Sequence, residues 1–371
     1  MDKMKTRNAN FELLRIIAML MVLSLHYMGK GGALGVIGGL TPNGVFAYVI
    51  EELCYVAVNV FILISGYFLV SANFRMEKLI KLWLQIFFYS ALIYLIFILF
   101  GNVDSLYKTK YFLGQALMPI THQEYWFLTS YFVLYLLSPF LGLLARKLKK
   151  EQLLTLCIVM LLFFSRVWKI LLPQSDPIDD RGYGYIWFVT LFFIGCYIRL
   201  YGKEDAKKWK YLIGYFVFVA INFSLMFGIS FVSKITGRFE QFTFVFNEYN
   251  APFTILASIS LFLFFKNLRI EDGKTSKVIC RISKSALAVY IIHEQFMLRG
   301  LWTSFWHVDY HFTKFYFLLH YIVCITAIFA ICIGIETLRD RLFNVIYRTK
   351  AVTKFFEFVS RVDRFFPRVD Q

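Results

Sequence analysis

A cation and an imidazole share one face of the first apolar segment, which runs from Phe11 to Met28. Arg15 and His26 are eleven positions apart, and eleven steps of about 100° make roughly three full helical turns. Their side chains therefore point the same way, about 16 Å apart along a helix axis. Ionisable groups are costly inside a membrane-length segment and are functional candidates there by default. The spacing thus predicts a positive charge near one membrane surface and a titratable ring at depth.

A second imidazole stands beside a carboxylate in a later apolar segment. His293 and Glu294 follow a stretch that begins at Ser285 and passes through Tyr290. A His-Glu pair at membrane depth is expensive unless it lines a cavity. We therefore favour a functional role for His293 and Glu294 over a role in helix packing.

Basic residues gather where the third apolar segment begins. Lys78 and Lys81 are three residues apart, so they share one side of a helix and could bind phosphates as point charges; Arg75 precedes them. The excess of basic residues in cytoplasmic loops accounts for the same pattern without a ligand. Both interpretations stay open at this point.

The two neighbouring apolar segments carry small and polar residues of a different kind. The second contains Asn59 and ends with Ser65, Gly66 and Tyr67, where a glycine lets a helix or a ligand come close. The fourth begins with Glu124, Tyr125 and Trp126. Tyrosine and tryptophan there are typical of a membrane interface, whereas the carboxylate could hold a hydroxylated ligand.

Composition indicates which elements must position these residues. Of the 371 residues 59% are hydrophobic and 17% are charged, whereas a soluble domain carries about 25% charged residues. Repeated apolar runs then predict an all-α polytopic membrane protein. We expect about ten transmembrane helices, at roughly 11–28, 46–70, 79–100, 125–145, 153–172, 185–201, 211–232, 251–265, 285–303 and 315–338.

The basic residues that give the net charge of +16 lie mainly outside these segments. Most of the lysines and arginines fall in alternate loops and in both terminal segments, which predicts that both termini are cytoplasmic. The charge therefore requires no nucleic-acid partner. We expect a transmembrane domain over 1–338 and a basic amphipathic tail over 339–371. The tail is interpreted either as a helix on the anionic inner leaflet or as a packed cytosolic helix.

The six cysteines show no metal-ligand spacing. Five of them lie in apolar segments, and Cys280 lies in a basic loop. We expect free thiols rather than disulfides, and we expect no bound metal.

Taken in order, these motifs resemble the acyltransferase family 3 membrane proteins, over about residues 8 to 300. The matching pieces combine spaced basic, aromatic and histidine residues: Arg15-x10-His26, Phe61-x3-Ser65-Gly66-Tyr67, Lys78-x2-Lys81, Tyr125-Trp126-Phe127 with Tyr135 to Pro139, and Ser285-x4-Tyr290-x2-His293. The family often has arginines where this chain has Lys78 and Lys81, so a bidentate grip on phosphate is not expected at these two positions.

The resemblance implies transfer of an acyl group, usually acetyl, from cytosolic acyl-CoA to a hydroxyl of a cell-surface carbohydrate or similar acceptor. His26 would be the base or the acyl carrier, with His293 and Glu294 on the same route. Acyl-CoA would be held by basic and small residues at the cytosolic end: Arg15, Arg75, Lys78, Lys81, Ser65, Gly66 and Tyr67. The acceptor would be held by Asn59, Glu124, Tyr125 and Trp126.

A plasma-membrane location, contact with membrane lipids and an extracytoplasmic glycan or lipid-linked sugar as acceptor follow from the same resemblance. The sequence leaves homodimerisation open. The competing function class is a transporter or flippase for a lipid-linked sugar or a small solute, since intramembrane charges suit that class as well. No internal repeat is visible, which weighs against a transporter built from repeats.

Overall fold

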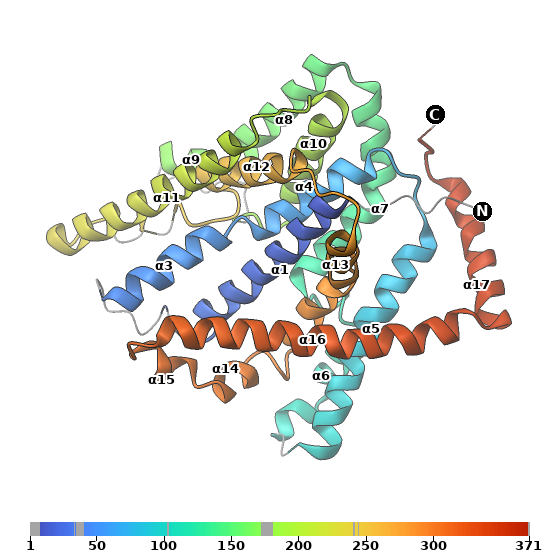
Figure 1. Cartoon of the computed structure of the whole chain (residues 1–371). Helices are drawn as coiled ribbons and strands as arrows, with labels where there is room; N and C mark the ends of the chain where they lie inside the picture. The colour runs from blue at the N-terminus through green and yellow to red at the C-terminus, as the bar shows by residue number, and fades with distance from the viewer. Residues whose placement is uncertain are drawn as a thin grey trace.

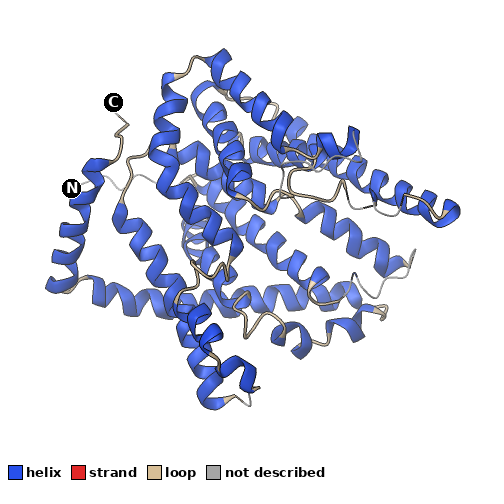
Figure 2. Ribbon diagram, turned by 180° about the vertical axis from the view of Figure 1, so that it is seen from behind, coloured by secondary structure: helices blue, strands red, loops and turns tan. Residues whose placement is uncertain are grey.

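The computed structural model describes residues 8–32, 34, 41–101, 104–171, 181–239, 242–243 and 245–369, and within these ranges the regular structure is helical, without strands. Figure 2 shows helices joined by loops throughout the molecule. The longer helices are α1 (Ala9–Gly29), α3 (Pro42–Cys54), α4 (Ala57–Leu69), α5 (Met76–Phe100), α7 (Trp126–Lys147), α8 (Lys150–Phe164), α10 (Tyr185–Tyr201), α11 (Trp209–Thr236), α12 (Pro252–Lys266), α13 (Lys274–His293), α16 (Phe317–Tyr347) and α17 (Lys350–Ser360). The shorter ones are η1 (Ser105–Lys108), α6 (Lys110–Leu117), α9 (Val167–Leu171), α14 (Leu301–Phe305), α15 (Val308–Phe312) and η3 (Arg361–Phe365).

Within the described ranges, six helical stretches are long and apolar enough to cross a membrane. They are α1, the α3–α4 pair, α5, α7, α11 and α16, and they coincide with six of the predicted segments. Two shorter apolar helices, α10 and α12, lie where two more were predicted. The chain is therefore a helical multi-pass membrane protein, as its composition predicts.

The remaining two predicted segments have different bounds in the structure. The segment predicted at 153–172 is divided into α8 and α9, which are separated at Ser165 and Arg166. Only the first part of the segment predicted at 285–303 belongs to α13, which begins at Lys274 and ends at His293, and the last part falls in α14. The end of α13 has a physical reason, since Glu294 and Gln295 leave the helix axis and their buried side chains enter polar contacts.

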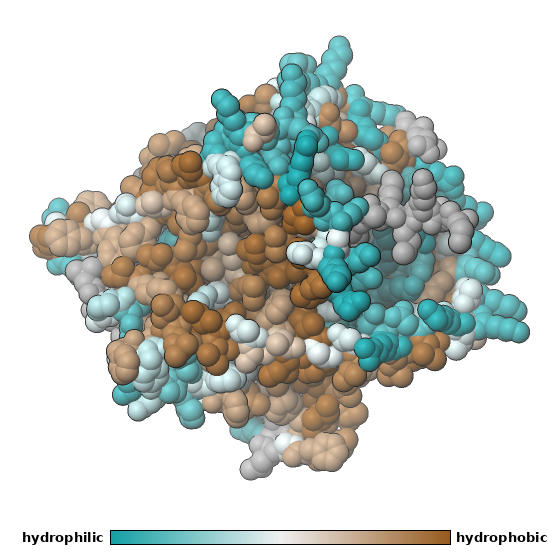
Figure 3. Space-filling model, viewed as in Figure 1, coloured by the Kyte–Doolittle hydropathy of each residue, from teal (hydrophilic) through white to brown (hydrophobic). Residues whose placement is uncertain are grey.

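The surface of the molecule matches a bilayer environment. Figure 3 shows hydrophobic side chains over the middle of the face seen in Figure 1. Hydrophilic side chains gather above and to the right, where Figure 1 places α8, α17 and the chain ends. Large apolar residues are exposed along the lipid-length helices, among them Leu99 at 63%, Ile213 at 63% and Leu319 at 63%. Water would penalise such a surface, whereas lipid does not.

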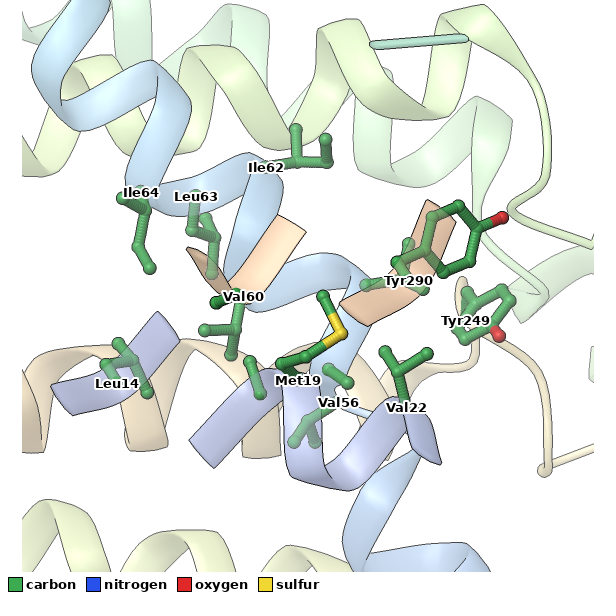
Figure 4. Close-up of a cluster of buried hydrophobic side chains, with 14 of the residues drawn as sticks. Leu14, Met19, Val22, Val56, Val60, Ile62, Leu63, Ile64, Tyr249 and Tyr290 are labelled. Carbon is green, nitrogen blue, oxygen red and sulfur yellow. The ribbon is translucent and has the colours of Figure 1, made fainter. Parts of the chain in front are cut away.

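Helix α1 lies within the bundle and packs against α3, α4, α12, α13 and α16. Figure 4 shows Met19 and Val22 of α1 beside Val56, which immediately precedes α4, and Val60 of α4. Ala18, Met19 and Val22 are buried. The part of α1 between its two polar positions is therefore packed in an apolar core.

The C-terminal tail packs against the loop between α4 and α5. Phe366 stacks on Phe74 with ring centroids 3.9 Å apart, and Asp363 Oδ1 accepts a hydrogen bond from the Met76 backbone N–H at 2.8 Å. Asn73 Oδ1 accepts a second one from the Val369 N–H. These contacts hold the last residues of the tail, whereas α17 exposes Phe355 and Phe358, so both interpretations of the tail stay open. The six cysteines are free thiols, as expected.

Candidate functional site

The two histidines singled out in the sequence meet in the structure. His26, near the end of α1, places its Nδ1 2.7 Å from Nε2 of His293, the last residue of α13. Glu294 Oε2 lies 3.2 Å from the same His26 nitrogen. His293 and Glu294 are buried, and the side chain of His26 is 18% exposed. The packing of α1 against α13 therefore assembles an imidazole pair with a carboxylate.

The hydrogen bonds around the two rings assign their protons. His293 Nδ1 lies 2.5 Å from the Val289 carbonyl oxygen, which can only accept, so this nitrogen carries the hydrogen. In a neutral ring the other nitrogen, Nε2, then accepts. His26 Nδ1 must donate to it, which leaves His26 Nε2 with the free lone pair. His26 Nε2 is thus the basic, nucleophilic atom of the cluster.

Two cations flank the carboxylate of this cluster. Lys30, one residue beyond α1, donates to Glu294 Oε1, and Arg299 Nη1 lies 3.9 Å from the same oxygen. Burial lowers the pKa of the Lys30 ammonium, while the Glu294 carboxylate beside it acts in the opposite direction. Lys30 and Arg299 together offset the charge of the buried Glu294 carboxylate, which would be strongly unfavourable without partners.

Arg299 connects this cluster to Glu124. It donates to Glu124 Oε1, and Gln115 donates to Glu124 Oε2. Burial raises the pKa of the Glu124 carboxyl, against Arg299 and Gln115, which lower it. Glu124, expected at the acceptor side, therefore belongs to the same polar cluster as His26.

The cluster also has the composition of a metal site. One ligand atom from each of His26, His293 and Glu294 lies within 4.8 Å of the others. Lys30 and Arg299 already supply positive charge to Glu294, and this charge opposes a further cation. The expectation of a metal-free site therefore stays a prediction.

The aromatic residues after Glu124 take two different positions. Tyr125 is fully buried and donates from its hydroxyl to the Ile291 carbonyl at 3.1 Å, which ties α7 to α13. Trp126 is half-buried and contacts Tyr183, with centroids 4.5 Å apart, and Tyr249, at 5.9 Å. Of the two, Trp126 lies in the more accessible surroundings.

Arg15 lies at the opposite end of α1, beside a cavity of about 790 Å³. It donates to Glu12 Oε1 at 2.5 Å, and Glu12 Oε2 accepts from Ser283 at 2.5 Å. The residues that line this cavity bring four cations together around one carboxylate: Arg15, Lys78, Arg199 and Lys284, with Glu12. Such a surplus of positive charge suits a polyanionic ligand.

The three basic residues predicted beside Arg15 separate in the structure. Lys78 lines the cavity. Arg75 pairs with Glu77 at 3.0 Å. Lys81 pairs with the same carboxylate at 2.6 Å and lies over the rings of Tyr347 and Phe356, at 4.7 and 5.0 Å. Arg75 therefore serves a local ion pair with Glu77. Lys81 serves the same ion pair and also packs on the tail through Phe356.

Ser65, Gly66 and Tyr67 lie on α4 with distinct roles. A Cβ on Gly66 would lie 2.2 Å from the Phe192 carbonyl oxygen, so α10 crosses α4 at backbone contact. Ser65 donates to the Phe61 carbonyl of its own helix. The Tyr67 hydroxyl accepts from Arg199 at 3.2 Å, which positions one of the four cavity cations.

Asn59 is fully buried in a structural network. Its amide donates to the Tyr249 carbonyl at 2.7 Å and to Ser258 at 3.2 Å, and its oxygen accepts from Trp187 at 3.1 Å. These bonds employ both donors and the acceptor of the amide. The position favours helix packing for Asn59 over contact with an acceptor.

Sequence reasoning did not select Lys30, Arg299 and Gln115 at one end of α1, or Arg199 at the other. All four lie in loops or at helix ends, where no periodic pattern marks a single residue. Basic residues such as Lys30, Arg199 and Arg299 are also usual there. The proximity of Lys30 to His26 in the sequence was the one signal that could have found a member of this set.

A family model described as an acyltransferase domain matches residues 8–337. The match includes both ends of α1, the end of α13 and every helix between them. No curated protein and no solved structure matches the chain.

Proposed function

The chain belongs to the acyltransferase family whose model matches residues 8–337, and on this premise we propose that it transfers an acyl group, most simply acetyl, from cytosolic acyl-CoA to a hydroxyl of a cell-surface carbohydrate or related acceptor. Its membrane is the plasma membrane, with both termini in the cytoplasm. This orientation follows from the distribution of basic residues between alternate loops. It places Arg15 inward and His26 outward.

The observation that carries the proposal is the free lone pair on His26 Nε2. In direct transfer this nitrogen takes the proton of the acceptor hydroxyl while the oxygen bonds to the thioester carbonyl carbon. The C–S bond then breaks, and the CoA thiolate takes the proton from the imidazolium. In relayed transfer Nε2 itself bonds to the carbonyl carbon and CoA leaves as the thiolate. The acceptor oxygen later bonds to the same carbon, the imidazole leaves, and the hydroxyl proton passes to the CoA thiolate.

His293 and Glu294 position the His26 ring in both routes. The Nδ1 proton of His26 faces His293 Nε2 at 2.7 Å and Glu294 Oε2 at 3.2 Å. In a Ser-His-Asp triad a carboxylate accepts from the corresponding Nδ1–H. Here His293 accepts this hydrogen bond, and Glu294 lies beside it, where its charge would stabilise the imidazolium. Here Lys30 holds the carboxylate in turn.

The cavity beside Arg15 supports a role in donor binding. CoA carries several phosphate charges at one end and a long uncharged arm that ends in the thioester. The cations of the cavity suit the phosphates. The face of α1 between Arg15 and His26 carries Ala18, Met19 and Val22, whose apolar side chains suit an uncharged arm. Opening the core along this face would let the thioester reach His26.

The test is the purified protein in liposomes with labelled acetyl-CoA. We expect label on a hydroxylated acceptor, or on the protein when acceptor is absent, and loss of both with His26→Ala in a folded, inserted protein. Movement of an unmodified solute without label transfer would instead indicate a transporter. Near-normal transfer by His26→Ala would disprove the role of His26.

A further inference from the structure

A second polar cavity, of about 510 Å³, lies in the half of the bundle where α1 ends. It lies between α3, the turn that precedes α10 and the loop that precedes α12. Its lining combines aromatic rings with hydrogen-bond acceptors: Tyr48, Tyr55, Tyr183, Glu51, Asn247 and Glu248. The mechanism above uses none of these residues.

Two buried oxygens in this cavity lack partners. Glu51 is 8% exposed and Asn247 is 6% exposed. Neither Glu51 Oε2 nor Asn247 Oδ1 has a hydrogen-bond partner among the described residues. An amide oxygen can only accept, and a carboxyl oxygen that is buried without a partner is unfavourable as well. A ligand that donates hydrogen bonds to this side of the cavity would satisfy such oxygens.

The local backbone fixes one wall of the cavity. Gly182 has a φ of +85°, and a Cβ there would lie 2.6 Å from Tyr249 Cβ, so the turn presses directly on Tyr249. This close approach holds Tyr183 against Tyr249, with centroids 5.1 Å apart. Tyr55 contacts Tyr249 from the other side at 5.3 Å. Tyr249 thus forms a rigid partition behind the cavity.

A continuous series of rings leads from this partition to His26. Trp126 contacts Tyr249 and Phe127, Phe127 contacts Tyr290 at 5.9 Å, and Tyr290 lies 6.4 Å from the His26 ring. Figure 4 shows where Tyr249 and Tyr290 lie relative to Val22 of α1. The aromatic contacts therefore connect the lining of the cavity to His26 through Tyr249, Trp126, Phe127 and Tyr290.

We infer that this cavity, defined here as the tyrosine cavity, binds a sugar unit of the acceptor next to the unit that receives the acyl group. The inference rests on the proposed function. Tyrosine faces suit the apolar faces of a pyranose ring, and Glu51 with Asn247 accepts hydrogen bonds from its hydroxyls. Arg166 and Arg181 lie 3.5 and 3.9 Å from Glu248, so they hold that carboxylate as a fixed wall.

The charge of the tyrosine cavity distinguishes a neutral sugar from other ligands. Glu51 and Glu248 line it with Arg181, which already pairs with Glu248, so the lining has no surplus of positive charge that would attract a phosphate or another anion. A metal ion is the competing occupant, because carboxylate and amide oxygens also bind hard cations. Excess EDTA in the assay separates the two ligands.

The experiment compares two exposed tyrosines two residues apart. Tyr183, 41% exposed, lines the cavity, whereas Tyr185, 43% exposed, does not. Membrane vesicles that contain the full-length protein and the glycans of the producing cell receive labelled acetyl-CoA. Label in the glycan fraction reports transfer, and the acetyl-CoA concentration for half-maximal transfer reports donor binding.

We expect Tyr183→Ala and Glu51→Gln to raise the glycan concentration for half-maximal transfer about tenfold or more, the size of one lost charge-assisted hydrogen bond. The acetyl-CoA concentration for half-maximal transfer should not change, nor should transfer by Tyr185→Ala. Equal effects of Tyr183→Ala and Tyr185→Ala, an equal rise in the acetyl-CoA concentration, or an EDTA inhibition of the wild type that disappears in Glu51→Gln would overturn the subsite. Wild-type vesicles that do not label glycan would overturn the proposed function, and the subsite with it.

Discussion

His26 Nδ1 and His293 Nε2 lie 2.7 Å apart although 267 residues separate them in the sequence. This bond joins the end of α1 to the end of α13. It directs the lone pair of His26 Nε2 away from the pair, toward the space where an acceptor and a thioester would meet. The following predictions test the parts of the site that this bond organises.

Removing the charge of Glu294 should slow the chemical step. Glu294→Gln keeps the shape of the side chain but weakens both the orientation of His26 and the stabilisation of its imidazolium. We expect kcat to fall by about a hundredfold, with the KM for acetyl-CoA nearly unchanged. Steady-state kinetics in liposomes measure both constants. Glu271→Gln, an exposed change on a loop, is the control, and an equal loss there would contradict the assignment.

Arg15→Ala should weaken donor binding. The variant removes one of the cations of the large cavity, so the KM for acetyl-CoA should rise about tenfold or more while kcat changes little. Arg269→Ala, which removes an 89% exposed arginine side chain, should leave the KM unchanged. If Arg15→Ala alters only the dependence on the acceptor, the donor cavity lies elsewhere.

Lys78 and Lys81 should differ, although both were expected to bind phosphate. Lys78→Ala should raise the KM for acetyl-CoA, because Lys78 lines the cavity. Lys81→Ala should act on the tail, because Lys81 covers the rings of Tyr347 and Phe356. Limited proteolysis of the tail, measured beside the KM, separates these outcomes. Identical effects on the KM would show that both lysines contact the donor.

Gly66→Ala should destabilise the protein through the crossing of α4 and α10. The added Cβ would lie 2.2 Å from the Phe192 carbonyl oxygen, so the two helices must separate. We expect a loss of about 1–3 kcal/mol, seen as a lower Tm in detergent. Gly334→Ala is the matched change, since nothing lies within 4 Å of a Cβ there. It should leave the Tm unchanged or raise it slightly.

Chelators should leave the activity unchanged. His26, His293 and Glu294 could in principle ligate an ion, but Lys30 and Arg299 already neutralise Glu294. Transfer rates before and after dialysis against EDTA measure the effect. A loss that Zn²⁺ restores would show that the cluster is a metal site.

The sequence was sufficient to select the site residues that share one helix or lie next to one another in the chain. Arg15 and His26 could be paired because a helix of known pitch fixes their relative direction. Gly66 could be read as a point of close approach, and Phe192 proves to be its neighbour. Such inferences stay within one element, where periodicity applies.

The contacts between different helices and loops could not be predicted from the periodicity of the sequence. Lys30 meets Glu294 only after α1 and α13 have packed, and Arg299 meets it through the conformation of the loop after α13. Loop residues carry no repeat that would reveal either contact. The bounds of α13 were missed for a related reason. Its first half, from Lys274 to Lys284, is rich in basic and hydroxyl residues and does not resemble an apolar segment. The tyrosine cavity likewise draws Glu51 and Asn247 from distant parts of the chain.

The tail also bears on the timing of biogenesis. Asn73 and Met76, beside the wall of the donor cavity, are held by Val369 and Asp363, which are 296 and 287 residues further along the chain. A ribosome makes those partners after helices α1 to α16. This side of the cavity beside Arg15 is therefore completed only after α16 has been made, and a shorter nascent chain lacks this brace.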